Sequence, residues 1–484
     1  MSVPLSHRPV LGSALGLLVG CGGSSPSAEN TARPVPDGPN VLLISVDTLR
    51  ADHVGAYGYA RRTSPHIDRL AAEGVLFENH ISSTSWTLPA HAALFTSLPD
   101  SVHGCTDTDR PLAAGITTLA ERFAAAGYDT AGFFAGPYLH PAFGLGRGFD
   151  HYENCTSYAA ALDDAPAGRW AMDVEVMRRS HRDITNPNVL AGFTRWLHQP
   201  RRGKFFVFLH LWDVHFDFIP PPPYDTMFDP GYEGSVTGED FFFDTSINPD
   251  MPARDLEHLI ALYDGEIAWT DEHVGRIIAE LEAVGQLDDT VIAVTSDHGT
   301  AFFEHGQKGH RNSLFDELIR VPLVIRYPPV LTGGTRVAPQ TRAIDVGPTL
   351  LELAGLPAPS TLPGGIMGRS LVELATSGNL DFDNTAVSEL FSVGHRERTV
   401  RTLQWKLYDL MTQRRRFWTN LIEDPAERRL RDAGSGDSPR TRYLEIVAEL
   451  SRRRRELTAG RGPAALPDDV RRQLEALGYV GTHE

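Results

Sequence analysis

The feature that most constrains the fold is a set of continuous apolar segments of strand length, each of which ends in polar residues. The clearest are residues 40–46, 204–210 and 290–296. Runs of this kind are typical of strands buried on both faces of a parallel sheet. Stretches with helical spacing alternate with them, so the sequence predicts an α/β fold in which a large, mostly parallel sheet is flanked by helices.

The same patterns set the expected order of the elements. Predicted strands are 40–46, 75–81, 128–135, 204–210, 290–296 and 321–326, and predicted helices are 67–73, 88–97, 117–126, 188–198, 255–285 and 345–354. The long helix 255–285 carries acidic residues that we expect on a solvated face, as in an amphipathic surface helix. These residues are Asp264, Glu266, Asp271 and Glu272.

The length of the chain and one Pro- and Gly-rich stretch indicate the domain organisation. A chain of 484 residues is long enough for one large domain with a smaller appendage. The Pro- and Gly-rich residues 356–368 predict the edge of the main domain, which we place at 39–370. Residues 371–484 predict a smaller α+β subdomain, with strand-like pieces within 384–410 and a short helix at 467–477.

The N-terminal segment has the pattern of a targeting signal. His7 and Arg8 precede an apolar stretch, 10–19, and then Cys21. Residues 1–20 resemble a bacterial lipoprotein signal peptide, because the apolar stretch is too short to span a bilayer. Residues 21–38 predict a flexible tether. We therefore expect an exported lipoprotein that reaches the periplasmic face of a membrane, or the cell surface, through a lipid on Cys21 alone.

Two further cysteines, Cys105 and Cys155, would remain in the mature chain. An exported compartment allows them to pair, and the sequence leaves both the paired and the free state open.

The charge of the chain limits its partners. The formal net charge of −17 argues against a nucleic acid, because binding to a phosphate backbone depends on a surplus of Lys and Arg. The Arg-rich runs 414–416 and 452–455 are expected to be solvated helix faces. An anionic substrate would have to be drawn in by a local positive site.

A threonine lies where the predicted helix 88–97 begins. The segment Thr87-Leu88-Pro89-Ala90-His91 places a hydroxyl before an early helical proline. Thr87 could be a helix N-cap. Alternatively, the free N–H groups and the positive end of the helix dipole would suit an anionic ester and its charged transition state.

Two acidic positions follow predicted strands and suggest a metal site. Asp47 comes after strand 40–46, and Asp297 and His298 come after strand 290–296. The carboxyl ends of parallel strands are where such folds bind ligands. Two carboxylates and an imidazole suit one divalent ion, Zn²⁺, Mn²⁺ or, with more oxygens, Ca²⁺. Such an ion would activate Thr87 as a nucleophile at neutral pH.

These residues resemble the sulfatase family of the alkaline-phosphatase-like superfamily. The resemblance extends to segments 208–222, 263–285, 295–322, 345–356 and 424–427. Several positions depart from the family pattern. Thr87 stands where the family has a Cys or Ser that becomes formylglycine, so no formylglycine is expected. Thr48 stands in place of a second metal-binding Asp, and His91 in place of the Arg that supports the nucleophile.

The resemblance also implies residues that bind the substrate. His215 lies in a loop like that of the family's substrate-contacting His, and the substrate-binding Lys falls on Arg311 or is replaced by His310. The combination of one threonine, two acids and a histidine looks more like the active sites of the Thr-dependent relatives in the superfamily, which form a phospho-enzyme on Thr. In this chain these residues are Thr87, Asp47, Asp297 and His298.

The expected function is therefore a metal-dependent hydrolase or transferase. It would cleave sulfate or phosphate esters of a small molecule, a glycan or a lipid headgroup, with Thr87 as nucleophile. In this interpretation Asp47, Thr87, Asp297 and His298 hold the metal, and His91, His215, His310 and Arg311 assist. The alternatives are a sulfuric ester hydrolase, similar to an arylsulfatase, that works without formylglycine, and a binder of anionic glycans without turnover.

Overall fold

The structure is a computed structural model that describes residues 36–157, 178, 180–201, 203–357, 367–378, 385–392, 395–434 and 438–458. The predicted signal peptide 1–20, most of the tether and the helix 467–477 lie outside these residues. In the described part of the chain, no helix combines the length and the apolar character that crossing a membrane requires.

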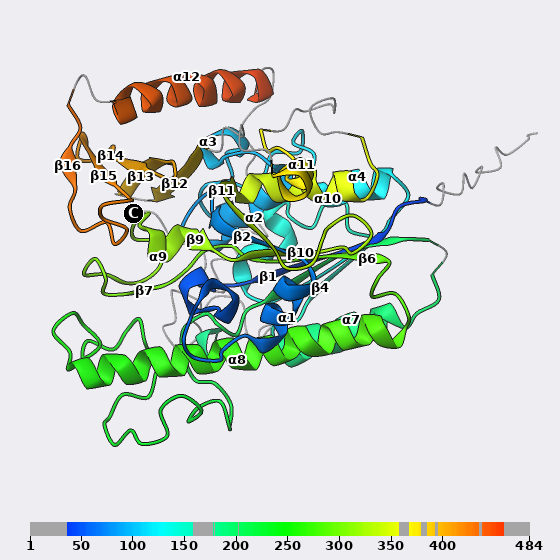
Figure 1. Ribbon diagram of the computed structural model, residues 1–484, viewed down its shortest axis with the longest axis horizontal. Helices are drawn as coiled ribbons and strands as arrows, with labels where there is room; N and C mark the ends of the chain where they lie inside the picture. Colours follow the sequence, from blue (N-terminus) through cyan, green and yellow to red (C-terminus); the bar gives the residue numbers. More distant parts are fainter. Residues whose placement is uncertain are drawn as a thin grey trace, which may run out of the picture. The chain divides into compact units, whose positions relative to one another are not determined.

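The centre of the fold is a mixed sheet of nine strands, drawn with its helices in Figure 1. The strands run in the order β11-β2-β10-β6-β1-β5-β3-β4, with β9 beside β2. Their bounds are β1 Asn40–Val46, β2 Val75–Ile81, β3 Asp129–Phe134, β4 His151–Asn154, β5 Phe205–Leu211, β6 Thr290–Ser296, β9 Arg320–Val321, β10 Leu323–Arg326 and β11 Thr335–Arg342. All residues of β1, β5 and β6 are buried, which confirms the prediction made from their apolar runs.

Most neighbouring strands are parallel, as predicted. Strand β1 pairs in parallel with β5 and β6, and β3 pairs in parallel with β4 and β5. Strand β10 is antiparallel to both β6 and β2. The single predicted strand 321–326 is wrong in one respect, because it is divided at Pro322 into β9 and β10. A proline has no N–H to donate to a sheet ladder.

Helices cover both faces of the sheet. Alternate residues of a strand point to opposite faces, so a strand that is apolar throughout presents apolar side chains on both faces that the helices bury. Val41 and Leu43 of β1 belong to one apolar cluster, together with residues of α2, α4 and α10. Leu42 and Ile44 belong to a second cluster, with residues of α1, α7 and α8. The helices are α1 Pro65–Glu73, α2 Thr87–Thr96, α3 Asp100–His103, α4 Leu119–Ala125, α7 Asn186–Leu197, α8 Ala253–Ala283, α9 Asp316–Ile319, α10 Val346–Leu353, α11 Val372–Ser377 and α12 Ser438–Thr458.

The acidic residues of α8 do not form a solvated face, so that expectation is wrong. Asp264, Glu266 and Asp271 are buried, and Glu272 is half-buried. Asp264 contacts His53 Nδ1, Tyr59 Oη and Arg61 Nη1, each at 2.7 Å. The other buried carboxylates accept backbone N–H groups, Glu266 from Ile219 and Asp271 from His66 and Ile67. The partners come from distant loops and the start of α1, which satisfy the buried charges.

The C-terminal part contains a second, antiparallel sheet and α12, which confirms the predicted subdomain type. Its strands, in spatial order, are β12 Ala386–Ser392, β13 His395–Arg401, β14 Trp405–Leu410, β15 Arg415–Asn420 and β16 Arg431–Asp432. Arginines 452–455 lie on α12, and all but Arg453 are exposed. Arginines 414–416 lie at the turn into β15, so their prediction as a helix face is wrong. The domain boundary at residue 370 stays a prediction.

Candidate active site

The predicted metal ligands meet at the carboxyl ends of two neighbouring strands. Strands β1 and β6 are parallel and pair Val46 with Ser296, so Asp47 and Asp297 leave the sheet side by side. One ligand atom from each of Asp47, Asp297 and His298 lies within 4.8 Å of the others, and all three residues are buried. The Nε2 atom of His298 lies 3.3 Å from Asp297 Oδ2 and 3.8 Å from Asp47 Oδ1.

Thr87 brings its hydroxyl to the same point. It is the first residue of α2, and Trp86 occupies the N-cap position, so the N-cap interpretation of Thr87 is wrong. Its Oγ1 atom lies 3.4 Å from Asp47 Oδ2 and 3.3 Å from His298 Nε2. The hydroxyl therefore lies between two candidate metal ligands at the N-terminal end of a helix, where an anion is favoured.

His91 contacts the backbone of Thr87. Its side chain is fully buried, and Nδ1 lies 2.9 Å from the carbonyl oxygen of Thr87, one helical turn earlier. Its Nε2 atom lies 3.0 Å from Ser45 Oγ. Burial lowers the pKa of His91 to about 4, so the ring is neutral at physiological pH. The contacts of His91 fix the first turn of α2.

Thr48 does not contribute its side chain to the cluster. The residue has a positive φ of 55°. Its Oγ1 donates to the carbonyl oxygen of Val214, while its backbone N–H points to Asp297 Oδ1 at 3.3 Å. The position expected to hold a second metal-binding acid therefore contributes only a backbone contact that orients Asp297.

His215 and His310 lie next to the cluster, and Arg311 lies beside Trp86. The ring centroids of His298 and His310 are 4.6 Å apart, and those of His310 and His215 are 5.0 Å apart. Burial lowers the pKa of both His215 and His310 well below the usual value. The Arg311 guanidinium lies 3.9 Å from the Trp86 ring centroid and pairs with Asp107 at 3.2 Å.

A cavity of about 750 Å³ opens beside these three residues. Its walls are rich in aromatic side chains and include His215, His310 and Arg311. Such a mostly apolar pocket with a few polar groups is typical of a small-molecule site. The aromatic lining residues are Tyr138, Trp212, Phe216, Phe242, Phe243 and Phe303.

The structure adds two histidines that sequence reasoning missed. His181 lines the cavity, its ring centroid is 5.6 Å from that of His215, and its buried Nδ1 has no hydrogen-bond partner among the described residues. His210 is the penultimate residue of β5, and its Nε2 lies 3.3 Å from Asp47 Oδ2. It pairs with Ser45, two residues before Asp47, so the register of β5 against β1 places it on the same face as Asp47.

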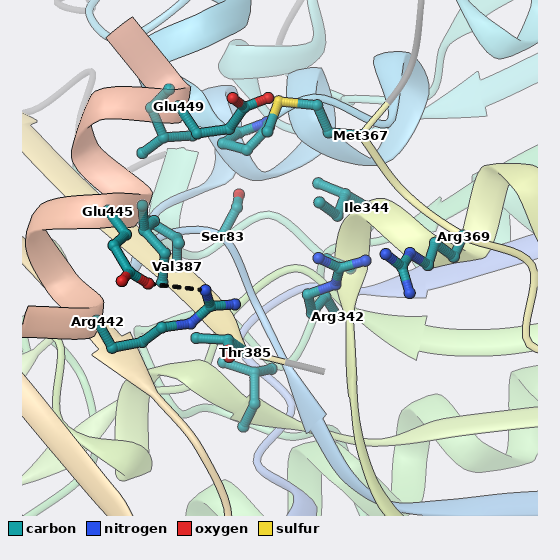
Figure 2. Close-up of a pocket in the computed structure, with 15 residues that line it drawn as sticks. Ser83, Arg342, Ile344, Met367, Arg369, Thr385, Val387, Arg442, Glu445 and Glu449 are labelled. Atoms are coloured by element: carbon teal, nitrogen blue, oxygen red, sulfur yellow. Dashed lines mark hydrogen bonds and ion pairs between the residues drawn. The ribbon is translucent and has the colours of Figure 1, made fainter. Parts of the chain in front are cut away.

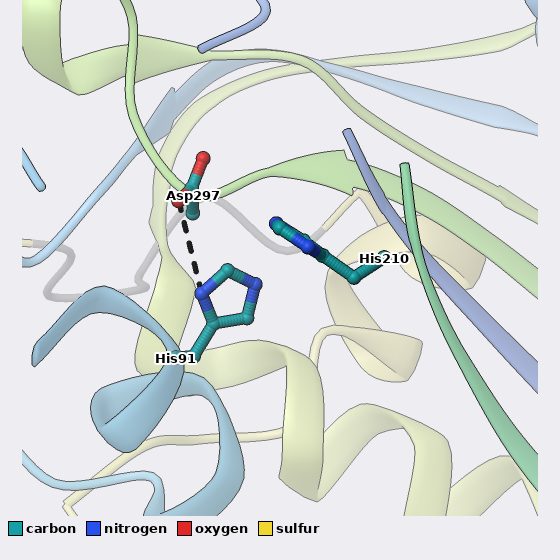
Figure 3. A group of neighbouring side chains, drawn as sticks. All are labelled: His91, His210 and Asp297. Atoms are coloured by element: carbon teal, nitrogen blue, oxygen red, sulfur yellow. Dashed lines mark ion pairs between the residues drawn. The ribbon is translucent and has the colours of Figure 1, made fainter. Parts of the chain in front are cut away.

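The donor set fits a divalent cation. In the described part of the chain, Asp47 Oδ1, Asp297 Oδ2 and His210 Nε2 are buried without a hydrogen-bond partner. Burial raises the pKa of Asp47 to about 6. Two buried carboxylates beside the unpaired Nε2 of His210 are costly unless a cation lies among them. Figure 3 shows His91, His210 and Asp297 converging from three elements around this point.

A second pocket lies apart from the candidate active site. It has a volume of about 260 Å³ and is lined by the ends of β2 and β11 and by α12, as Figure 2 shows. Arg342, Arg369 and Arg442 line it together with Glu445 and Glu449. None of the candidate site residues lines this pocket. Cys105 and Cys155 are likewise outside the site, and both are buried free thiols.

The chain belongs to the sulfatase family, because residues 39–356 match the sequence model of that family. Residues 304–456 match the C-terminal region of N-sulphoglucosamine sulphohydrolase. The protein is thus a hydrolase of a family whose members normally bind a divalent metal ion.

Particular relatives refine the comparison. N-acetylglucosamine-6-O-sulfatase of Bacteroides thetaiotaomicron is 23% identical over 409 residues, which cover 70% of this chain and 71% of the relative. Ulvan-active sulfatase of Formosa agariphila is 26% identical over 400 residues, covering 77% and 72%. The crystal structure of phosphonate monoester hydrolase of Agrobacterium radiobacter superposes with a TM-score of 0.69 at 25% identity, covering 88% of this chain and 99% of that chain.

Proposed function

We propose that this protein cleaves sulfate or phosphate esters by using the Thr87 hydroxyl as nucleophile beside a divalent metal ion. The observation that carries the proposal is the position of Thr87 Oγ1, 3.4 Å from Asp47 Oδ2 and 3.3 Å from His298 Nε2. Asp47, Asp297 and His298, with Thr87, would hold the ion. When bound, the ion lowers the pKa of the hydroxyl and offsets charge on the ester.

The chain's own residues perform the remaining tasks. The Thr87 hydroxyl loses its proton as Oγ1 forms a bond to phosphorus or sulfur. The bond between that phosphorus or sulfur atom and the ester oxygen breaks, and the leaving oxygen takes up a proton, so that the product leaves as an alcohol. Water then attacks the ester on Thr87, which releases the inorganic anion and restores the hydroxyl. An acceptor alcohol in place of water would make the reaction a transfer. The contact between His91 and the Thr87 carbonyl orients the nucleophile for attack.

Phosphoryl chemistry fits this site better than sulfuryl chemistry. A formylglycine hydrate can expel sulfate by collapsing to an aldehyde, whereas an ester on Thr must be removed by attack of water. No formylglycine is expected, because Thr87 cannot give one and both described cysteines are buried outside the site. Phosphoryl transfer to a simple alkoxide depends mainly on positioning and electrostatic stabilisation. A sulfuric ester hydrolase without formylglycine is the second candidate.

The cavity beside the cluster indicates the kind of substrate. Its aromatic side chains would contact the leaving group, while His215, His310 and Arg311 would contact the anionic ester. We therefore infer a ring-bearing small molecule or a glycan ester, in keeping with the sugar sulfate and ulvan substrates named for the relatives. A lipid headgroup ester is the other substrate class compatible with a membrane-anchored chain.

The test compares four nitrophenyl esters with the purified chain from Gly38 onward: a sulfate, a phosphate, a phosphonate monoester and a phosphodiester. Mass spectrometry of the quenched reaction then searches for an adduct on the peptide that contains Thr87. We expect turnover of at least one phosphorus ester and an adduct on Thr87. If the protein binds a metal but turns over neither these esters nor any anionic glycan ester, the result would favour the non-catalytic glycan binder.

Thr96→Ala is the matched control for this experiment. Thr96 is a buried threonine at the other end of α2, and its hydroxyl donates to the carbonyl oxygen of Ala92. The Thr96→Ala protein should turn over substrate and form the adduct as the wild type does. An adduct that persists in Thr87→Ala would assign the nucleophile to another residue.

For localisation, we propose an exported lipoprotein anchored through Cys21. The support is the sequence pattern of residues 1–20 alone, which lie outside the described residues. Labelling of cells with a fatty-acid analogue should modify the wild type and leave Cys21→Ala unmodified. Equal labelling of both proteins would contradict the anchor.

A further inference from the structure

We infer that His210 is a further protein ligand of the metal centre and that the centre therefore selects Zn²⁺ over Ca²⁺. This inference rests on the proposed function only in that both place a divalent ion beside Thr87. It concerns which atoms hold the ion, and it can be tested without turnover. Its evidence is the direction in which each imidazole of the cluster presents a lone pair.

The tautomer of His210 follows from its backbone contact. Nδ1 lies 2.9 Å from the carbonyl oxygen of Ala135. A carbonyl oxygen can only accept, so Nδ1 carries the proton and Nε2 of the neutral ring carries a lone pair. That lone pair is directed at the cluster, where Nε2 lies 3.3 Å from Asp47 Oδ2 and has no hydrogen-bond partner among the described residues. Two acceptors therefore face each other in a buried site.

His298 has the same arrangement. Its Nδ1 donates to the carbonyl oxygen of Gly299 at 2.9 Å, which leaves the Nε2 lone pair towards Asp47, Asp297 and Thr87. A metal-binding histidine usually donates its other N–H to a carbonyl or carboxylate in this way. His210 and His298 thus present two nitrogen lone pairs to the carboxylates of Asp47 and Asp297.

Two of the distances between these donor atoms suit one small ion. The distance from His210 Nε2 to Asp47 Oδ2 is 3.3 Å, and so is the distance from His298 Nε2 to Asp297 Oδ2. Tetrahedral zinc with bonds of about 2.0–2.1 Å has ligand-to-ligand edges of about 3.3–3.4 Å. One ligand atom from each of His91, His210 and Asp297 lies within 4.8 Å of the others, so His210 and Asp297 can reach the same ion.

His91 is close to the cluster but is not a ligand. Its Nδ1 approaches Asp297 Oδ2 at 3.7 Å, as Figure 3 marks. That nitrogen donates to the carbonyl oxygen of Thr87, and Nε2 accepts from Ser45 Oγ. Both ring nitrogens are therefore satisfied without a metal. His91 positions Thr87, whereas His210 has a lone pair that only a cation or a proton can satisfy.

The donor types select the ion. Imidazole nitrogen suits zinc and other transition metals, whereas Ca²⁺ takes six to eight oxygen ligands. With His210 and His298 both bound, the centre has two nitrogens and two carboxylates beside the Thr87 hydroxyl. Thr48 adds no side-chain oxygen because its hydroxyl donates to Val214. A site of this composition should bind Zn²⁺ tightly and Ca²⁺ weakly.

The test is zinc X-ray absorption of the purified wild-type protein, in which scattering from ring carbons counts the imidazoles. We expect two imidazoles in the wild type and in His91→Gln, and one in His210→Gln. We also expect His210→Gln to bind zinc at least about 10–100-fold more weakly. One imidazole in the wild type would overturn the inference and identify His210 as a proton-sharing partner of Asp47. That wild-type result decides the matter even if His210→Gln fails to fold.

Competition between ions provides a second readout. Elemental analysis after dialysis of wild-type protein against equal Zn²⁺ and Ca²⁺ should find zinc, and retention of calcium would overturn the proposed selectivity. The same measurements on Thr87→Ala separate this inference from the proposed function. Two imidazoles on zinc in that inactive variant would support the metal centre, whatever the wild type does to esters.

Discussion

The hydroxyl of Thr87 lies 3.3 Å from Nε2 of His298, although the two residues are 211 positions apart in the chain. This contact joins the first turn of α2 to the residues that follow β6 and places Thr87 beside the candidate metal ligands. Replacing Thr87 by Val keeps the shape of the side chain and removes the hydroxyl, which is both the proposed nucleophile and one of the groups proposed to hold the ion. We expect Thr87→Val to lose at least about 10³-fold in kcat and Thr87→Ser to retain measurable turnover, in steady-state assays. Wild-type rates in Thr87→Val would contradict the assignment.

His181 should affect substrate binding more than chemistry. Its ring lines the cavity near His215, and its Nδ1 is a buried polar atom without a partner among the described residues. Loss of one hydrogen bond to substrate costs about 1 kcal/mol, so His181→Ala should raise KM by about fivefold and leave kcat nearly unchanged. His151→Ala, at an exposed position on β4, is the control. A fall in kcat alone would assign His181 to the reaction itself.

Removing the metal should destabilise the fold. Asp47 and Asp297 are buried carboxylates whose Oδ1 and Oδ2 atoms, respectively, have no hydrogen-bond partner among the described residues. An ion present at about 1,000 times its Kd stabilises a protein by about 4 kcal/mol. A chelator should therefore lower the unfolding temperature in calorimetry, and added metal should restore it. The Asp47→Asn/Asp297→Asn protein should show no such response, and an equal response there would place the ion elsewhere.

Asp316 should make stability depend on pH. Burial disfavours its charge, but Arg401 and Lys406, at 2.7 and 2.9 Å, hold the pKa of Asp316 well below its usual value. Because the pKa is lower in the folded state, the stabilisation is complete at neutral pH and is lost as pH falls below about 4. Asp316→Asn should cost about 3–5 kcal/mol at pH 7 in denaturant unfolding, and the difference should shrink in acid.

The control for this prediction is Asp432→Asn. Asp432 is 82% exposed and lies 3.7 Å from Arg415. Loss of an exposed pair should change the free energy of unfolding by at most about 1 kcal/mol at any pH. A difference between wild type and Asp316→Asn that stays constant from neutral to acid pH would show that Asp316 does not titrate as described.

The sequence predicted the parts of the molecule that follow from periodicity. Buried strands have a continuous apolar pattern, so β1 and β6 and the acids after them, Asp47 and Asp297, could be found without a structure. His210 was missed because a histidine that ends an apolar strand looks like a core residue. Only the register of β5 against β1 shows that it shares a face with Asp47.

Other features depended on contacts between distant segments. The acids of α8 were assigned to solvent from helical spacing, yet Asp264 is paired with His53 and Arg61, some 200 positions earlier. The cavity is built from segments that have no periodic pattern, among them 242–249 and 303–312. The position of His181 in its wall therefore had no signal in the sequence.

The antiparallel direction of β10 has a consequence for how such proteins diverge. Leu323, at the start of β10, pairs with Thr295, near the end of β6. The segment between them, which carries His298, His310 and Arg311, therefore leaves and re-enters the sheet at neighbouring points of one edge. A segment closed in this way can change length and composition without altering the register of the strands. The register that sets Asp47 beside Asp297 does not depend on the residues beyond His298. The part of the segment that carries His310 and Arg311 can therefore differ between such proteins while the candidate reaction centre keeps its geometry.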